Sequence, residues 1–218
     1  MVQREKIPEY LRKSECRLVL RRNCRNTQNI AMTAASAIDV EPVFWEKLPL
    51  GKKPEFHILP DTNLLILKLT ELVSTYITNG VSAQQITILT VKKEETSLLA
   101  GLDKIGKHKL VRTRKEEGVL FTTARKFKGL ESDVVIIIDV DSGTFSSNES
   151  KNLFYVGTSR AKHFLDIVAV IDKEELKNIA KALTGEDTAS DNSKIASFLK
   201  VRIFDENQKL ERVRQLDW

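Results

Sequence analysis

The chain has 218 residues, with 35 Lys and Arg against 30 Asp and Glu, so its net charge is +5 and its sequence pI is about 9.1. A hydrophobic fraction of 41% and a charged fraction of 30% exclude wholesale disorder and are typical of an ordinary globular protein. No apolar run approaches the length of a membrane span, and the charged start MVQREKIPEYLRK predicts no secretory signal.

The first part of the chain alternates strand and helix patterns around a proline-rich connection at Glu41–Pro60. Apolar spacing and capping residues define the elements on either side of that connection. The predicted elements are a strand at Cys16–Arg21, a helix that Asn26 or Thr27 caps and that ends near Ile38, a strand at Glu55–Leu59, and a helix from an Asp61 cap to Asn79-Gly80.

The same alternation continues to the end of the chain. The strongest strand is Asp133–Asp141, whose unbroken apolar run predicts burial on both faces of a parallel sheet. The other predicted elements are strands at Ile86–Val91, His108–Thr113, Val119–Thr123 and Phe164–Ile171, helices at Lys93–Leu102, Asn148–Lys162, 172–183 and Lys194–Lys200, a polar segment at Thr184–Ser193, and a charged tail to Trp218. Strands that alternate with helices predict an α/β fold with a mostly parallel sheet flanked by helices.

Three polar segments fall at or near the predicted carboxyl ends of strands, where parallel sheets bind ligands. They are Arg21–Thr27, Thr122–Glu131 and Tyr155–Lys162. Each combines cations with hydroxyl or small residues, a mixture that suits phosphate oxygens. The alternative is that these segments are helix caps and solvated loops.

Several familiar sites have no sequence support. The chain contains no GxxxxGK[ST] phosphate loop, no GxGxxG fingerprint and no GxSxG elbow. His57, His108 and His163 show no metal-ligand spacing, so no metal site is expected. Cys16 and Cys24 form no CxxC pair, which excludes a zinc ribbon or disulfide scaffold and favours a cytoplasmic location.

The three polar segments together resemble the second RecA-like lobe of UvrD/Rep-type superfamily 1 DNA helicases. Motif IV of that family resembles LRRNCRNTQNI at 20–30, motif V resembles TTARKFKGLESDVVII at 122–137, and motif VI resembles NLFYVGTSRAKHFLDIV at 152–168. The resemblance implies a RecA-like lobe over 17–183, with a stub at 1–16 and a helix and charged tail at 184–218.

The resemblance also assigns roles on the nucleotide side of the lobe. Arg25 and Arg160 match the motif IV and VI arginines that reach the ATP γ-phosphate, where they stabilise charge in the transition state. Glu131 matches the residue that contacts the ribose, although it could simply cap the following strand. Lys128 and Gly129 match the turn that lets the backbone approach the nucleotide.

Thr123, Arg125 and Lys126 match the part of motif V that faces single-stranded DNA, where cations would meet phosphates. For Lys126, a solvated surface lysine is an alternative of about equal weight to a DNA contact. Tyr155 and Phe154 read better as core residues than as base-stacking residues. The partners implied are single-stranded DNA and an N-terminal RecA-like lobe, in cis or as a separate chain, and no membrane.

The chain departs from the family pattern in three ways. Cys24 stands where many members carry an aromatic that stacks on adenine, and Arg125 replaces a histidine. Only about 90 residues separate motifs IV and V, which leaves no room for the large accessory subdomain of UvrD and Rep. The Walker A and B motifs belong to the first lobe. ATP and Mg²⁺ are therefore expected only in a complete two-lobe enzyme, and this chain alone is expected neither to hydrolyse ATP nor to unwind DNA.

Two other functions remain open at this stage. The chain could be a free-standing nucleic-acid-binding module that kept the fold and lost catalysis. It could instead be a protein-interaction domain whose basic tail, 200–214, docks a partner.

Overall fold

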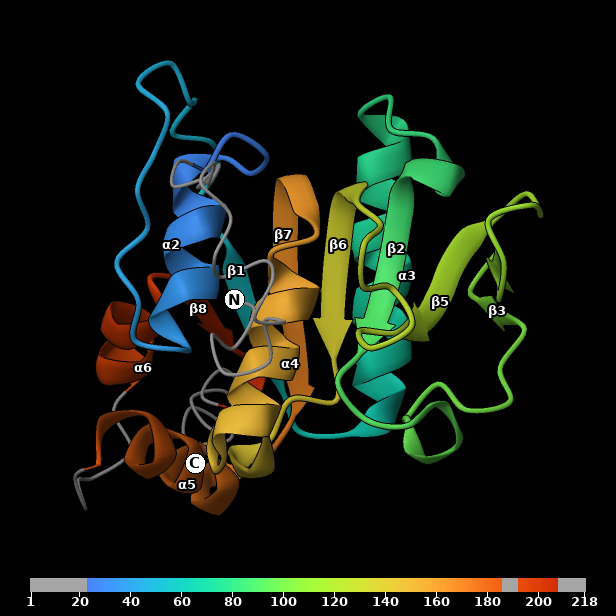
Figure 1. The fold of residues 1–218 in the computed structure, drawn as a ribbon. Helices are drawn as coiled ribbons and strands as arrows, with labels where there is room; N and C mark the ends of the chain where they lie inside the picture. Colours follow the sequence, from blue (N-terminus) through green and yellow to red (C-terminus); the bar gives the residue numbers. More distant parts are fainter. Residues whose placement is uncertain (1–22, 186–191, 208–218) are drawn as a thin grey trace, which may run out of the picture.

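The structure, a computed structural model, describes residues 23–185 and 192–207. Within them the strands form a single sheet in the order β3-β4-β5-β2-β6-β7-β1-β8 (Figure 1). All neighbours are parallel except β3 and β4, which are antiparallel, so the predicted α/β fold with a mostly parallel sheet is confirmed. The strands are β1 Glu55–Leu59, β2 Ile86–Thr90, β3 Lys104–Ile105, β4 His108–Val111, β5 Val119–Thr123, β6 Ser132–Ile138, β7 Ala161–Val170 and β8 Arg202–Asp205.

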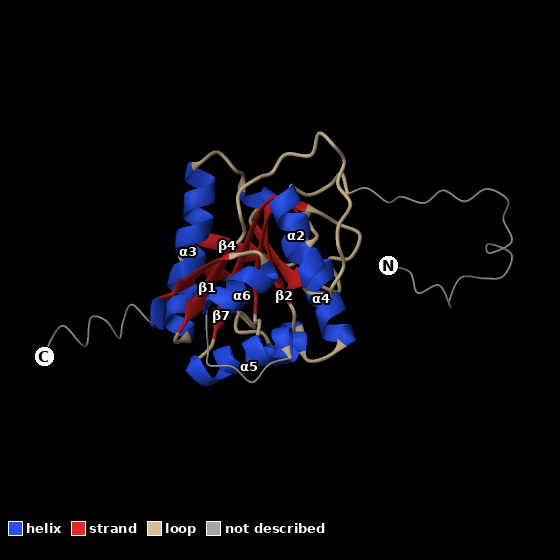
Figure 2. Ribbon diagram, turned by 90° about the vertical axis from the view of Figure 1, so that its left-hand side faces the viewer, coloured by secondary structure: helices blue, strands red, loops and turns tan. Residues whose placement is uncertain are grey.

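Helices cover both faces of this sheet. The long helix α3 packs on one face, and Figure 2 shows it across the sheet from α2 and α4. The apolar side chains of α5 and α6 belong to the same core as those of α2 and α4. The helices are α2 Gln28–Ser36, α3 Thr62–Thr78, α4 Asn148–Thr158, α5 Lys173–Thr184 and α6 Asn192–Leu199, with short 3₁₀ turns η2 Ala83–Gln85, η3 Glu94–Thr96 and η4 Ser142–Phe145.

The central strand β6 explains why the sheet needs both layers. Val135 and Ile137 pack into the core under α2 and α4, whereas Val134, Ile136 and Ile138 pack into the core under α3. All five are fully buried, and burying each such side chain stabilises the fold by roughly 1.5–3 kcal/mol. The predicted burial of this strand on both faces is confirmed. Among the helices of the described residues, none is both long and apolar enough to cross a membrane.

The predicted helix at Lys93–Leu102 is wrong. Only the 3₁₀ turn η3 forms there, and the rest is irregular. The cause is the buried carboxylate of Asp139, which accepts hydrogen bonds from the Ser97 hydroxyl at 2.6 Å and from the Leu98 backbone N–H at 3.0 Å. These bonds divert the segment from a helical path. Gly101, with a φ of +71°, then turns the chain away.

The predicted border between α4 and β7 is also displaced. The helix ends at Thr158 and the strand begins at Ala161, so Ala161 and Lys162, predicted as the end of the helix, belong to the strand. The Thr158 hydroxyl donates to the Phe154 carbonyl at 2.8 Å, and the Ser159 hydroxyl donates to the Val156 carbonyl at 3.1 Å. These side chains satisfy the last carbonyl oxygens of α4 and close the helix.

The predicted strand at Cys16–Arg21 lies outside the described residues. At the other end, α6 spans Asn192–Leu199 instead of the predicted 194–200. Residues 202–205, read as part of a charged tail, form β8, which runs parallel to β1 with Arg202 opposite Glu55. This part of the tail therefore extends the sheet.

Candidate nucleotide site and nucleic-acid interface

The residues singled out from the sequence lie at two opposite edges of the sheet. Thr123 ends β5 at the carboxyl edge, as expected. Glu131 and Arg160, however, directly precede β6 and β7, so they lie at the amino edge. The expectation that all three polar segments gather near carboxyl ends is therefore wrong. Residues 124–131 lead from one edge to the other, because β5 and β6 are parallel and β2 lies between them.

At the amino edge, three charged residues from distant parts of the chain come together. Arg25 Nε lies 3.2 Å from a carboxylate oxygen of Glu131, and both side chains are about half exposed, at 47% and 48%. Arg25 and Arg160 line the same pocket of about 510 Å³, together with Asn23, Cys24 and Tyr155. The structure thus brings together the two arginines and the glutamate that the resemblance assigns to the nucleotide.

The side chain of Arg160 is held by the end of α4. Its Nε donates to the Val156 carbonyl at 3.1 Å, and its guanidinium also contacts the Ser159 hydroxyl at 3.2 Å and the Leu130 carbonyl at 3.5 Å. A cation on the last carbonyls of a helix is favourable because that end carries partial negative charge. These contacts fix the direction of the guanidinium before any ligand binds.

The electrostatics of this edge favour an anion. Partial burial, and after it the positive charge of Arg25, lower the pKa of Arg160, although a guanidinium stays charged near neutral pH. Two guanidinium groups face a single carboxylate, Glu131. The cluster therefore keeps a net positive charge, and phosphoryl oxygens could neutralise it through bidentate hydrogen bonds.

Asn26 is a residue of this site that sequence reasoning missed. Its side-chain NH₂ donates to the carbonyls of Ser159, at 2.9 Å, and Ala161, which flank Arg160. The Asn23 side chain in turn donates to Asn26 at 3.1 Å and accepts from the Arg25 N–H at 3.0 Å. These bonds attach the segment that carries Arg25 to the segment that carries Arg160. Of the two predicted helix caps, Asn26 and Thr27, Thr27 takes the cap position, without a side-chain capping bond.

The two aromatic residues of α4 divide between core and pocket. Phe154 is fully buried and packs edge-on against Phe145, with ring centroids 5.1 Å apart, so its predicted place in the core is confirmed. Tyr155, predicted in the core as well, is only partly buried and lines the pocket beside Arg25 and Arg160. Because it lines the same pocket as the two arginines, it is a further candidate for contact with a ligand.

The turn before Glu131 combines a buried residue, Phe127, with the exposed residues Lys128 and Gly129. Phe127 is fully buried, and the Arg114 guanidinium lies 5.0 Å above its ring and also donates to the Glu131 carbonyl. Lys128 and Gly129 are exposed. Gly129 has a φ of +93° with no atom within 4 Å of a built Cβ, so its backbone can be closely approached.

At the carboxyl edge, the residues matched to DNA contacts border a groove of about 840 Å³, which Lys92 and Lys93 also line. Arg125 pairs with Glu149 at 3.1 Å, and Lys126 pairs with Glu94 at 2.9 Å. Hydrogen bonding between Lys126 and Glu94 raises the pKa of the lysine and lowers that of the glutamate. A phosphate would have to compete with these carboxylates for the cations.

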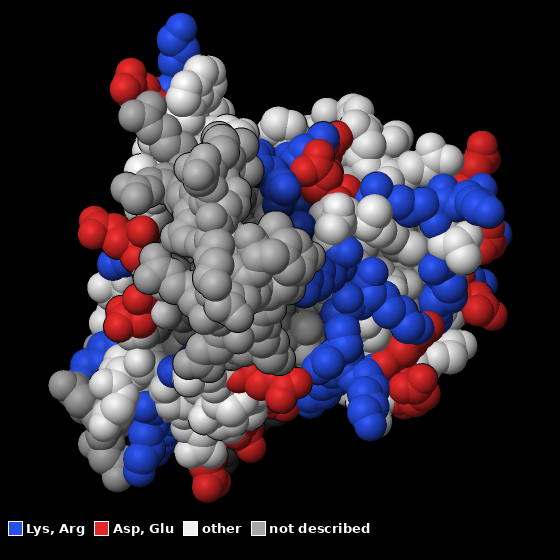
Figure 3. All heavy atoms as spheres, in the orientation of Figure 1, with Lys and Arg blue, Asp and Glu red and all other residues white. Residues whose placement is uncertain are grey.

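Thr123 has a local structural role. Its hydroxyl accepts a hydrogen bond from the Lys126 backbone N–H at 3.1 Å, and the residue is only 8% exposed. This bond fixes the turn that presents Arg125 and Lys126. Figure 3 shows the face of the sheet that α2 and α4 cover, where Lys and Arg side chains gather in a band with acidic groups beside them.

Comparisons with known proteins bear on the family resemblance and the fold. Residues 118–168 match the family model of the UvrD-like helicase C-terminal domain. The fold is similar to that of the C-terminal domain of a possible DNA helicase from Lactobacillus plantarum WCFS1, with a TM-score of 0.57 and 18% sequence identity over 82% of this chain and 97% of that one. No curated protein matches the chain. The resemblance found in the sequence, and the RecA-like fold that it implied, are confirmed.

Proposed function

We propose that this chain is the second motor lobe of an ATP-dependent DNA helicase and that it supplies Arg25 and Arg160 to an ATP site between two lobes. The observation that carries the proposal is the convergence of these arginines with Glu131 at one edge of the sheet. The match to the UvrD-like helicase C-terminal domain supports it.

The residues at this edge fit a nucleoside triphosphate. A guanidinium that the end of α4 already orients loses little freedom when it donates to phosphoryl oxygens. Arg25, about half exposed and paired with Glu131, can exchange part of that contact for a phosphate. Bound ATP would supply the transferable phosphoryl group, and the first lobe would hold its phosphates and Mg²⁺.

The carboxyl edge would guide the DNA strand. Arg125, Lys126 and the neighbouring lysines border a groove that a phosphodiester backbone could follow. Residues 124–131 connect this groove to Glu131, so movement of the strand and closure around ATP would act on one segment. Since the Walker motifs belong to the first lobe, the chain by itself would neither hydrolyse ATP nor unwind DNA.

The test is steady-state ATP hydrolysis by the two-lobe protein, with this chain linked to its first lobe or mixed with it. Arg25→Ala and Arg160→Ala should each lower kcat by roughly 10³-fold or more, because they remove charge stabilisation of the transition state. Circular dichroism should show that both variants are folded. Arg202→Ala, which removes a half-exposed arginine from β8, is the matched control and should leave turnover unchanged.

Either of two results would contradict the proposal. One is an Arg160→Ala variant that keeps more than a tenth of the turnover; the other is magnesium-dependent hydrolysis by the isolated chain. Salt-sensitive binding of single-stranded DNA without any ATPase partner would instead support a free-standing nucleic-acid-binding module. Loss of complex formation on removing the tail alone would support an interaction domain.

A further inference from the structure

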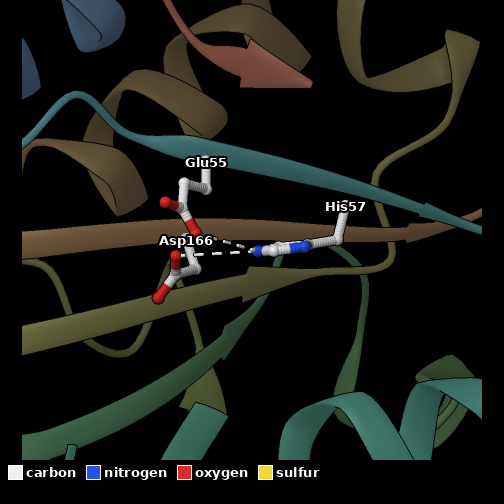
Figure 4. A group of neighbouring side chains, drawn as sticks. All are labelled: Glu55, His57 and Asp166. Atoms are coloured by element: carbon white, nitrogen blue, oxygen red, sulfur yellow. Dashed lines mark ion pairs between the residues drawn. The ribbon is translucent and has the colours of Figure 1, made fainter. Parts of the chain in front are cut away.

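A cluster of ionisable side chains lies on the other face of the sheet, which α3 covers. Glu55 and His57 point from β1 and Asp166 points from the neighbouring strand β7, as Figure 4 shows. His57 Nε2 lies 3.7 Å from Glu55 Oε2 and 3.8 Å from Asp166 Oδ1. One ligand atom from each residue lies within 4.8 Å of the others.

The imidazole of His57 is buried without a hydrogen bond. Its residue is 4% exposed, and neither Nδ1 nor Nε2 finds a hydrogen-bond partner in the described part of the chain. The two carboxylate oxygens are too far from Nε2 for a hydrogen bond. A buried polar atom without a partner costs about 1–3 kcal/mol, so something other than these side chains should satisfy Nε2.

Each of the two carboxylates is bound by a neighbouring side chain through the oxygen that does not face His57. Lys52 Nζ lies 2.8 Å from Glu55 Oε1, and the Tyr76 hydroxyl donates to Asp166 Oδ2 at 2.6 Å. These contacts leave Glu55 Oε2 and Asp166 Oδ1 facing His57. Carboxylates oriented through their second oxygen are typical of metal ligands.

We propose that Glu55, His57 and Asp166 bind a divalent transition-metal ion of the Zn²⁺ type. One imidazole nitrogen and two carboxylate oxygens are a suitable donor set, and water would take the fourth position. Ligands about 2.1 Å from a tetrahedral ion stand about 3.4 Å apart, so the two carboxylate oxygens need to approach His57 Nε2 by only a few tenths of an ångström. The ion would also neutralise two carboxylates at a largely buried site.

The ion would join β1 directly to β7, the strand that follows Arg160. It would lie on the opposite face of the sheet from α4, so its role would be to stabilise the sheet and not to take part in chemistry at the arginine pair. Histidine spacing within one element does not predict this site. Glu55 and Asp166 are 111 positions apart and meet only through strand register.

The test is metal-dependent stability of the purified full chain after removal of bound metal with a chelator. Zn²⁺ at about a hundred times its Kd should raise Tm by roughly 5–10 °C. Co²⁺ should give visible absorption bands whose intensity saturates at one ion per chain. His57→Gln and Asp166→Asn should abolish both effects, whereas His163→Gln, which changes an exposed histidine, should keep them.

Glu55→Gln and Lys52→Ala keep the proposal testable if the buried variants do not fold, because both residues lie at the rim of the cluster. Glu55→Gln removes a metal ligand and should weaken Zn²⁺ binding. Lys52→Ala removes the partner that orients Glu55 and should raise the Kd for Zn²⁺ roughly 10–100-fold. The proposal is overturned if millimolar Zn²⁺ leaves Tm unchanged, or if His57→Gln and Glu55→Gln respond to Zn²⁺ as the unmodified chain does.

Discussion

Asn26 shows how a neutral side chain can decide the geometry of a charged site. Its NH₂ group donates to the carbonyls on both sides of Arg160. We expect Asn26→Ala to lower the ATP turnover of the two-lobe protein by about 10²-fold, since a misplacement of about 1 Å at an oriented group costs that much. The variant should also lose roughly 1–3 kcal/mol of stability, because two buried carbonyls lose their donor.

Asn29→Ala is the control for this substitution. The Asn29 side chain also donates to a backbone carbonyl, that of Gly51, at 2.9 Å, but at an exposed position away from Arg160. Its removal should leave turnover within twofold of the unmodified protein. If Asn26→Ala behaves in the same way, the hydrogen bonds of Asn26 do not position the arginines.

The resemblance to motifs IV, V and VI predicted that Arg25, Glu131 and Arg160 would share a site, because each motif of the family carries one of them. They could not predict Asn26, whose hydrogen bonds reach residues 133 and 135 positions away. An asparagine before a helix usually caps that helix, and this local reading concealed the long-range one. Long-range polar contacts of this kind have no periodic signal in a sequence.

His108 links two elements, since its Nε2 lies 2.8 Å from the Ser74 hydroxyl of α3 while the residue belongs to β4. Burial, and after it the charge of Lys107, lower the pKa of His108 below its ordinary value near 6.5. The unfolded chain therefore binds a proton at a higher pH than the folded one. This contribution to stability is complete above about pH 6.5 and is lost as the pH falls from there toward the folded pKa.

Urea unfolding at several pH values between 5 and 8 tests this link. The unmodified chain should lose stability below about pH 6.5, and His108→Gln should lose less over the same range. His163→Gln, at an exposed position, should follow the unmodified chain. An unchanged pH dependence in His108→Gln would mean that the link between α3 and β4 does not titrate.

The edge strand β8 contributes more than its four residues suggest. Phe204 stacks on His57 with centroids 5.2 Å apart, and the preceding Val201 is 1% exposed. A chain that ends at residue 200 should be less stable than one that ends at residue 207 by at least about 2 kcal/mol, because it loses this burial. It should also self-associate, since β1 becomes an open edge.

Chemical unfolding and light scattering of these two truncated chains, measured side by side, isolate the contribution of β8. Equal stability in the two chains would show that the strand is dispensable. The sequence did not predict this strand, because the charged residues Arg202 and Asp205 are typical of a charged tail. Elements with a long apolar run, such as β6, were predictable because burial on both faces leaves a continuous signal in the sequence.

At the scale of the whole molecule, the net charge of +5 says less about phosphate binding than which cationic side chains are already paired with carboxylates. The groove at the carboxyl edge holds several cations, yet Glu149 and Glu94 already engage Arg125 and Lys126. Composition predicts only that phosphate binding is possible. The structure adds that these cations are already paired; under the proposed function, the surface would bind DNA weakly until the strand displaces the carboxylates, as suits a motor lobe that releases DNA in every cycle.

This balance can be shifted in both directions by single substitutions. Glu149→Gln should tighten the binding of single-stranded DNA several-fold and steepen its salt dependence, because each additional phosphate contact adds about 0.7 to the slope of log K against log salt. Arg125→Gln should weaken binding and flatten that slope by a similar amount. Fluorescence anisotropy titrations at several salt concentrations measure both quantities.

Glu71→Gln is the matched control, since Glu71 pairs with Lys68 on α3, the helix on the other face of the sheet. It removes the same charge and should change affinity only through the small rise in overall positive charge. If Glu149→Gln and Glu71→Gln have equal effects, the strand does not pass over Arg125. An effect confined to Glu149→Gln would instead locate the phosphate backbone at the carboxyl edge. Residues 124–131 lead from that edge to the amino edge, where the arginine pair lies.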